Sequence, residues 1–382
     1  MAFMLTFPVF AQEAKDSDKK DEGYKFTEVT TIKVTPVKDQ YRSGTCWSFA
    51  GLGFLESELL RMGKGEHDLS EMWIVRKCYE DKAKQYVRWH GKINFGGGGA
   101  FHDVFSVVKN YGILTEKQYK GLNYGDTAHI HGEVDAICKS YVEAVIKNAN
   151  KKISPAWFQG YCGLLDAYLG KVDANPMKQE SLGLNMDDYV EITSFTHHPF
   201  YSKFIIEVED NWMLDEVYNV KLDEMIEIID NALNNGYPVA WGADVSEKGF
   251  SWTKGIAIVP EENRSDLDGL ERAKWEKLSA KEKNDLLYSF DKPVIEKQIT
   301  QELRQEGFDN YQTTDDHGMV IVGIAKDQNG NKFYKVKNSW NTTNPYNGYF
   351  YASEAFVKYK TIDIAVHKGA IPKNIKKSLD LK

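Results

Sequence analysis

Residues 40–60 read QYRSGTCWSFAGLGFLESELL, and in this stretch a cysteine precedes an apolar run with helical spacing. Ser43, Gly44 and Thr45 come directly before Cys46. The apolar residues that follow recur at helical intervals, at Phe49, Leu52, Leu55, Leu59 and Leu60. Small residues and a thiol stand where bulky side chains would close the helix start into the core. Cys46 is therefore either a small buried side chain or a thiol exposed at a helix N-terminus.

The chain has 382 residues, of which 42% are apolar and 13% aromatic, so one large domain or two ordinary ones with a sizeable core are expected. Lys and Arg number 48 and Asp and Glu 56, which gives a net charge of −8. A nucleic-acid partner would require a basic face, and the basic residues are scattered, so we expect no such partner. No apolar run is long enough to cross a bilayer, so no membrane span is predicted.

Four widely spaced cysteines argue against a metal or disulfide framework. No Cys-x-x-Cys or Cys/His ligand spacing occurs, so no metal site and no cofactor are predicted. Besides Cys46, we expect Cys78, Cys138 and Cys162 to be ordinary buried or half-buried thiols.

The N-terminal sequence MAFMLTFPVFAQEAKDSDKK favours export. An apolar stretch ends in small residues at Ala11 and a charged stretch follows, as at a signal-peptidase site. Residues 1–11 are predicted to be the remnant of a signal peptide, with Gln12 as the new N-terminus and a periplasmic or secreted location. The alternative is an N-terminal tail on a cytoplasmic protein. Residues 12–30 are predicted to form a solvated N-terminal extension.

Helical patterns dominate the first half of the chain and strand patterns the second. Helices are predicted over 46–108, interrupted by the glycine run NFGGGGAF, over 140–169, over 222–233 and in the charged segment 260–307, which we expect to be a solvated face. Strands are predicted over 189–198, 202–212, 237–245, 318–327, 332–340 and 348–356, with a tight turn at Asn329-Gly330. This order predicts an α+β fold of two lobes with a cleft between them.

Thiol catalysis requires a thiolate, a base and donors for an oxyanion. A helix N-terminus lowers the pKa of a thiol, which suits Cys46. Among nine histidines, His317 begins a strand from which its imidazole can enter the cleft, and Asn338 can accept its Nδ1–H. His102 is expected near the cleft but without a nearby acceptor. The remaining histidines are expected in exposed, polar contexts or in a loop: His67, His90, His129, His131, His197, His198 and His367.

These residues occur in an order that resembles the papain-like cysteine peptidases: Gln40, Cys46-Trp47-Ser48-Phe49-Ala50, His317 and Asn338-Ser339-Trp340. The segments DLSEMWIVRKC (68–78), GGAFHDVFSVVKNYGI (98–113) and NGYFYASEAF (347–356) also resemble that family. Within it, Ser43 in place of a disulfide cysteine and NNGYPVAWGADVS (234–246) are similar to the bleomycin hydrolase and aminopeptidase C branch.

The resemblance implies a peptidase domain over residues 31–382. It consists of a helical lobe at about 40–120, a helical insertion at about 121–185 and a β-rich lobe at about 186–370. It also implies roles for individual residues: Cys46 as nucleophile, His317 as proton shuttle, Asn338 as its orienting partner, Gln40 as oxyanion donor, and Gly98, Gly99, Asp316 and Trp340 as residues that contact substrate. The implied partners are peptide substrates and, as in that branch, other copies of the chain in a hexamer.

Two departures from the pattern bear on function. Asn341 stands where the family has glycine, which alters the turn behind the site. The C-terminal sequence IPKNIKKSLDLK is shorter than the arm whose carboxylate captures the free amine of the substrate in that branch. The first expectation is an aminopeptidase acting on short peptides. The alternatives are an endopeptidase or dipeptidase with an open cleft, and a catalytically idle binding protein on the same fold.

Overall fold

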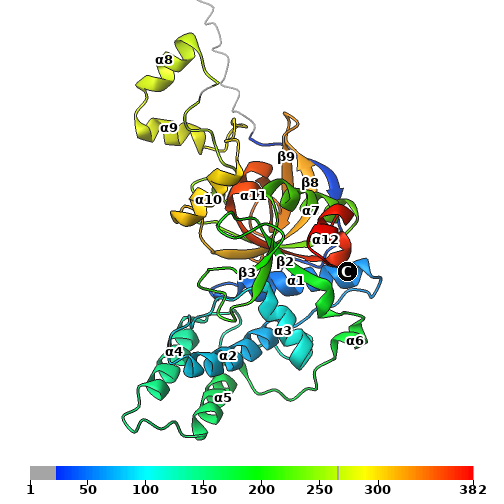
Figure 1. Ribbon diagram of the computed structural model, residues 1–382, viewed down its shortest axis with the longest axis vertical. Coiled ribbons are helices and arrows are strands. Elements are labelled where there is room, and N and C mark those ends of the chain that lie inside the picture. The colour runs from blue at the N-terminus through cyan, green and yellow to red at the C-terminus, as the bar shows by residue number, and fades with distance from the viewer. Residues whose placement is uncertain (1–22, 265, 382) are drawn as a thin grey trace, which may run out of the picture.

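A computed structural model describes residues 23–264 and 266–381, arranged as a helical lobe against a sheet lobe (Figure 1). The predicted signal peptide and the extension up to residue 22 lie outside the described residues. Helices gather in the lower half of the view, and the sheet with its own helices forms the upper half. This arrangement confirms the α+β prediction with two lobes.

Three helices build the core of the first lobe: α1 (Cys46–Arg61), α2 (Glu71–Arg88) and α3 (Phe101–Tyr111). Helix α1 is buried from Trp47 to Leu59 because it lies between the other two helices and the sheet. A Cβ on Gly51 would lie 2.7 Å from a methyl group of Val104, so glycine permits the close approach of α1 to α3. The Ser70 side chain caps α2 by accepting a hydrogen bond from the Trp73 N–H.

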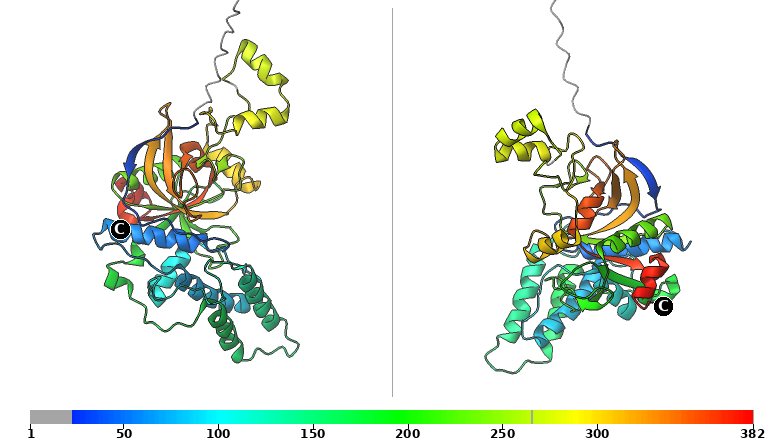
Figure 2. Two further views of the ribbon diagram at one scale, coloured as in Figure 1. Left: turned by 180° about the vertical axis from the view of Figure 1, so that it is seen from behind. Right: turned by 45° about the horizontal axis from the view of Figure 1, so that its top comes forward.

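Shorter elements extend this lobe: α4 (Gly132–Ile146), α5 (Ala156–Leu169), α6 (Gln179–Leu182) and the 3₁₀ turn η1 (Met186–Asp188). Helices α4 and α5 contact each other and project from one end of the molecule (Figure 2). The prediction of helices over 140–169 is confirmed, although α4 begins earlier, at Gly132.

Within residues 23–264 and 266–381 the sheet has eleven strands and runs β3-β4-β2-β11-β5-β8-β9-β10-β7-β6, with β1 paired to β8. Its strands are β1 (Thr27–Thr31), β2 (Tyr189–Thr193), β3 (Lys203–Ile205), β4 (Glu216–Asn219), β5 (Val239–Ala243), β6 (Phe250–Ser251), β7 (Ile256–Ala257), β8 (His317–Lys326), β9 (Lys332–Lys337), β10 (Tyr349–Ser353) and β11 (Thr361–His367). Strand β8 lies near the middle of the order and packs against α1, so its first residue, His317, is held at the interface of the lobes.

The helices of the sheet lobe are α7 (Leu222–Asn234), α8 (Gly269–Lys277), α9 (Ala280–Leu287), α10 (Gln301–Asp309), α11 (Glu354–Lys360) and α12 (Lys373–Ser378), with the 3₁₀ turn η2 (Lys368–Ala370). Helices α8 and α9 stand apart from the sheet (Figure 2), and most of their side chains are exposed. This confirms the predicted solvated face for α8 and α9, whereas α10, in the same charged segment, has a fully buried Arg304. Across the residues that the structure describes, no helix is long and apolar enough to cross a membrane.

Three local predictions are wrong because long-range contacts decide these segments. Residues 24–30 are not a solvated lead-in: β1 pairs with β8, Tyr24 is buried, and the Phe26 ring stacks 4.0 Å from that of Tyr351. The strand predicted over 202–212 is limited to Lys203–Ile205, after which a loop crosses towards the glycine run. His131 is fully buried rather than exposed.

Candidate active site

Cys46 is the first residue of α1, and the loop before it is held by its own polar groups. The Ser43 hydroxyl donates to the Gln40 carbonyl at 2.8 Å and lies 2.6 Å from the Thr45 hydroxyl. Ser43 thus cross-links a bend in which the family resemblance places a disulfide cysteine. On the other side, a Cβ on Gly318 would lie 3.2 Å from the Trp47 Cα, so the start of α1 rests directly on β8.

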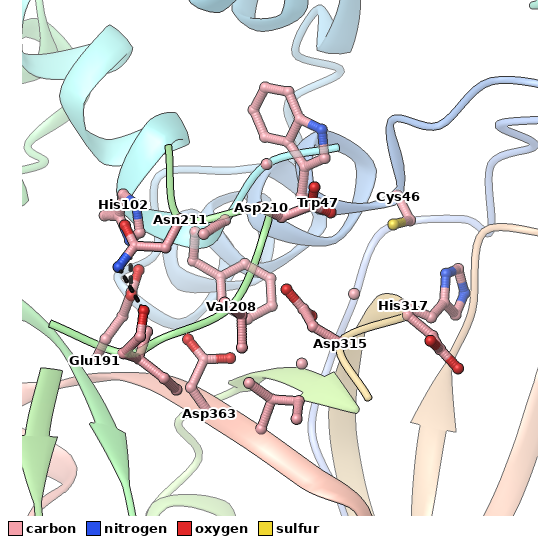
Figure 3. A pocket seen from close by; sticks show the side chains of 18 residues that line it. Cys46, Trp47, His102, Glu191, Val208, Asp210, Asn211, Asp315, His317 and Asp363 are labelled. Carbon is pink, nitrogen blue, oxygen red and sulfur yellow. Dashed lines mark hydrogen bonds and ion pairs between the residues drawn. The ribbon is translucent and has the colours of Figure 1, made fainter. Parts of the chain in front are cut away.

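His317 is the first residue of β8, and its Nε2 lies 2.7 Å from Oδ1 of Asn338. We predicted that Asn338 would accept a hydrogen bond from Nδ1 of His317. That prediction is wrong, because the nitrogen paired with Asn338 is Nε2. The register of β8 and β9 places the two residues at the same sheet end, with Nε2 towards the amide. This leaves Nδ1 as the ring nitrogen that can exchange a proton with a thiol. Cys46 and His317 line the same end of one pocket (Figure 3).

The segment after Asn338 links the two halves of the site. The Ser339 hydroxyl donates to Oε1 of Gln40 at 2.6 Å, and Nε2 of Gln40 donates to the Ser43 carbonyl at 2.9 Å. The Gln40 amide is thereby fixed beside the start of α1 with one N–H still available. The Trp340 ring lies 4.5 Å from the imidazole of His317, between centroids, and covers it. Trp340 is not among the residues that line the pocket.

Asn341 occupies a left-handed backbone conformation, with φ of +59°. Asparagine is one of the few non-glycine residues that adopt this region readily. Its Oδ1 also accepts hydrogen bonds from the N–H and hydroxyl of Thr343. The replacement of the family's glycine is therefore accommodated in the same turn.

Burial governs the charge state of the thiol and the imidazole. It raises the pKa of Cys46 to about 12, and the Asp315 and Asp210 carboxylates add to this effect. A hydrogen bond from the Gly318 backbone N–H to the Cys46 sulfur lowers this pKa, but by less than burial raises it. Burial also lowers the pKa of His317 to about 4. The expectation of a thiol pKa lowered by the helix N-terminus is therefore wrong, because desolvation outweighs the helix.

Other side chains approach the backbone closely at both predicted glycines. A Cβ on Gly98 would lie 2.1 Å from a carboxylate oxygen of Asp210, and one on Gly99 would lie 2.9 Å from the Trp47 ring. The Lys82 ammonium donates to the Gly98 carbonyl at 2.5 Å. Gly99 lines the pocket together with Cys46. Gly98 is not among the lining residues, and its backbone lies against the Asp210 carboxylate.

The pocket is small, with a volume of about 30 Å³, and Cys46 lies in its wall (Figure 3). Five carboxyl groups line it, contributed by four different parts of the chain: Glu191, Asp210, Asp315, Asp316 and Asp363. Only Asp316 was predicted to contact substrate. Its carboxylate is exposed and accepts hydrogen bonds from the Ser246 N–H at 3.1 Å and the Thr314 hydroxyl at 2.9 Å.

An ion pair at the far end of this pocket was not predicted from the sequence. Nδ1 of His102 lies 2.9 Å from Oε2 of Glu191, and both side chains are buried. Burial alone would lower the pKa of His102, but the Glu191 carboxylate raises it to about 10, so His102 carries a positive charge at neutral pH. The prediction that His102 lacks an acceptor is wrong because Glu191, 89 residues away, reaches it through β2.

A separate group of side chains has the spacing of metal ligands. Nε2 of His197 and Nε2 of His198 each lie 3.1 Å from an oxygen of Glu207, and the three ligand atoms lie within 4.8 Å of one another. The two histidines sit on the loop after β2 and Glu207 follows β3, and none of the three residues lines the Cys46 pocket. It therefore contributes nothing to the chemistry at the thiol.

Comparison with known proteins matches both halves of this site. Residues 24–160 match the papain family of cysteine proteases, and residues 284–382 match the peptidase C1-like family. The first range contains Gln40 and Cys46, and the second contains His317 and Asn338. Together with the thiol and the imidazole in one pocket wall, and the Asn338 amide hydrogen-bonded to that imidazole, these matches define the chain as a papain-like cysteine peptidase.

Longer similarities identify the branch. Aminopeptidase C of Listeria innocua is 22% identical over 91% of this chain and 83% of its own length. A cathepsin L-like peptidase of Aedes aegypti is 35% identical, but over only 32% of this chain and 35% of its own length. The structure of PepW from Lactobacillus rhamnosis covers 93% of this chain and 84% of its own, with 16% identity and a TM-score of 0.68. The similarity to aminopeptidase C over most of the chain supports the predicted resemblance to the bleomycin hydrolase and aminopeptidase C branch.

Proposed function

We propose that the protein is a cysteine aminopeptidase that removes residues from the N-terminus of short peptides. The observation that carries this proposal is the length of the similarity. Aminopeptidase C aligns with 91% of the chain, which spans both lobes and the segment 161–283 between the two family matches. The similarity to a cathepsin L-like peptidase covers only 32% of the chain.

The proposed reaction uses the residues at the lobe interface. As the Cys46 sulfur bonds to the substrate carbonyl carbon, its proton passes to Nδ1 of His317, which then donates it to the departing amine as the C–N bond breaks. Water attacks the resulting thioester, His317 takes the proton from water, and the free acid and the thiol are released. Asn338 orients the imidazole through the 2.7 Å hydrogen bond.

The developing oxyanion requires donors close to the thiol. We assign this role to the Cys46 backbone N–H, at the N-terminus of α1, and to the remaining N–H of the Gln40 amide. The hydrogen bond from Ser339 to Gln40 keeps this amide in place before the substrate arrives. Such preorganised donors stabilise charge that develops only in the transition state.

A second candidate, an endopeptidase or dipeptidase with an open cleft, is favoured by the position of α12. Ile375 and Leu379 are buried in the core cluster that contains α7, and no residue after Asp363 is among those lining the Cys46 pocket. Within the described residues, the C-terminal segment therefore leaves the acyl side of the thiol open. A longer, N-blocked peptide can enter a cleft of this kind.

The test compares fluorogenic amides of one amino acid with N-acetylated forms of the same compounds and with longer N-blocked peptides. An aminopeptidase hydrolyses the free amides at least about tenfold faster, and equal rates on blocked substrates would favour the second candidate. Cys46→Ala abolishes hydrolysis and labelling by E-64-type epoxides, whereas Cys162→Ser, a change at a half-buried thiol on α5, retains both. Unchanged turnover in Cys46→Ala would overturn the peptidase proposal altogether.

A further inference from the structure

The glycine run 96–99 ends at the wall of the Cys46 pocket but has no side chains with which to hold its own backbone. The run lies outside the helices and strands, and none of its four residues forms a backbone–backbone hydrogen bond with another described residue. Glycine has more conformational freedom to lose on folding than any other residue. The side chains that contact this run from other elements therefore determine its conformation.

Lys82 on α2 contacts the run from the interior of the helical lobe and is only 2% exposed. Its ammonium donates to the Gly96 carbonyl at 3.0 Å and to the Gly98 carbonyl at 2.5 Å. The carbonyl between them, that of Gly97, accepts a hydrogen bond from Nε1 of Trp47 at 2.9 Å. Two side chains thus fix three successive peptide groups of the run.

The partners of Lys82 are unusual for a buried ammonium group. Burying such a charge costs several kcal/mol, and a carboxylate in direct contact is the common compensation. The described residues give Lys82 no ion pair of this kind, and its donors are directed at the backbone of the run instead. Asp103 and Asp210 act on it from further away: burial raises the pKa of both carboxyl groups, and the charge of Lys82 opposes that rise. The Trp212 ring centroid lies 5.5 Å from the ammonium.

The hydrogen bond to the Gly98 carbonyl also sets the direction of the next N–H group. In a trans peptide the carbonyl and the N–H point to opposite sides, and the described residues contain no cis peptide bond. Because the Gly98 carbonyl points to Lys82, the Gly99 N–H points away from α2. This N–H forms no hydrogen bond with another part of the described chain, and Gly99 lines the pocket together with Cys46. A backbone donor is therefore available at the pocket wall.

We propose that Lys82 is a positioning residue: its two hydrogen bonds hold the Gly98–Gly99 peptide so that the Gly99 N–H binds the backbone of an extended substrate. Lys82 does not line the pocket and acts only through the run. A donor that is fixed before the substrate arrives avoids the entropy cost of ordering a glycine loop on binding. The inference rests on the proposed peptidase function, because it concerns how the substrate of that site is held.

Two nitriles of different length separate positioning from general support of the fold. Leucine nitrile and leucyl-leucine nitrile carry the same reactive group, and in each the Cys46 sulfur bonds to the nitrile carbon while the thiol proton passes to the nitrile nitrogen. The longer compound adds one peptide group on the acyl side, which is the part that reaches the run. A positioning role affects the longer nitrile selectively, whereas a purely structural role weakens both nitriles equally.

Both affinities are measured by calorimetry on the full chain and on its variants, and thermal unfolding establishes that each variant is folded. In Lys82→Met, we expect leucyl-leucine nitrile to lose about five- to tenfold more affinity than leucine nitrile, the effect of about one hydrogen bond. Lys82→Arg keeps the charge and the donors and should restore most of the difference. Lys84→Met, on the same helix, removes an ammonium that pairs with Asp81 and should change neither affinity.

Equal losses for the two nitriles in Lys82→Met, or no loss for either, would overturn the inference. If Lys82→Met does not fold, Lys82→Gln provides the same comparison, because its shorter amide cannot donate to both carbonyls. The proposed function is tested separately by hydrolysis in the parent chain. Turnover with nitrile affinities that do not depend on Lys82 leaves the peptidase proposal standing and removes only the role of Lys82, whereas a parent chain that binds neither nitrile contradicts both.

Discussion

Replacing Asn338 by aspartate tests whether a neutral His317 carries the chemistry. The Asn338 Oδ1 accepts a 2.7 Å hydrogen bond from Nε2 of His317, whose pKa burial lowers to about 4. The Asn338 Nδ2 group is buried and has no hydrogen-bond partner within the described residues. A carboxylate oxygen can therefore replace this amide nitrogen without breaking a hydrogen bond, so the substitution changes charge and preserves shape.

A second buried histidine in the same chain indicates the size of the effect. His102 faces the Glu191 carboxylate at 2.9 Å, and although burial would lower its pKa, this neighbour raises it to about 10. His317, which faces an amide at a similar distance, has a pKa of about 4. His102 also lies near Asp103 and Asp215, so the carboxylate accounts for part of the contrast. We expect Asn338→Asp to raise the pKa of His317 by at least about two pH units, or about 2.7 kcal/mol.

The assay is the pH profile of kcat/KM on an aminoacyl amide. A protonated imidazole cannot accept the thiol proton, so activity is lost as pH falls through the pKa of His317. A raised pKa therefore moves the acid limb of the profile upwards, and Asn338→Asp should lose most activity at pH 5 while retaining it near pH 8.

The matched variant Asn338→Ala removes the acceptor without adding charge. It should lower the rate about 10- to 100-fold at every pH, because the imidazole N–H is left buried and unpaired, and its acid limb should not move upwards. An acid limb that stays in place in Asn338→Asp would refute the reasoning.

Three other substitutions test separate parts of the site. Gln40→Ala should lower kcat about 10²- to 10³-fold with little change in KM, and an unchanged kcat would exclude this amide as an oxyanion donor. Gly98→Ala places a Cβ 2.1 Å from the Asp210 carboxylate, so it should destabilise the fold by about 1–3 kcal/mol in thermal unfolding and raise KM. Asp315→Asn should lower the pKa of Cys46 and so speed its alkylation by iodoacetamide at pH 8; an equal rate would mean that burial alone sets this pKa.

Local sequence patterns were sufficient to predict the elements that carry the proposed catalytic residues. The small residues before Cys46 and the apolar spacing after it predicted α1, and the apolar run after His317 predicted β8. The pairing of Asn338 with the imidazole was predicted from the residues themselves, but with Nδ1 in place of Nε2. That choice depends on the side-chain rotamer at the end of β8, which the sequence pattern does not specify.

The acidic pocket could not be predicted in the same way because its residues are distant in sequence. Glu191 lies in a strand that reads as ordinary buried sheet, and His102 lies in a helix 89 residues earlier. Asp363 reaches the pocket only because β11 is inserted between β2 and β5 in the sheet order. The available signal was weak: single acidic residues inside otherwise apolar strands, at Glu191 in YVEIT and Asp363 in TIDIAVH.

The high pKa of the Cys46 thiol has two causes, burial first and the pocket carboxylates second. Burial and the carboxylates of Asp315 and Asp210 together disfavour a thiolate at Cys46. Burial also lowers the pKa of His317 to about 4, so the resting pair is a neutral thiol and a neutral imidazole. In the proposed reaction the sulfur must therefore lose its proton to Nδ1 of His317 as it attacks the carbonyl carbon, and a change that lowers the pKa of Cys46, such as Asp315→Asn, should ease that step.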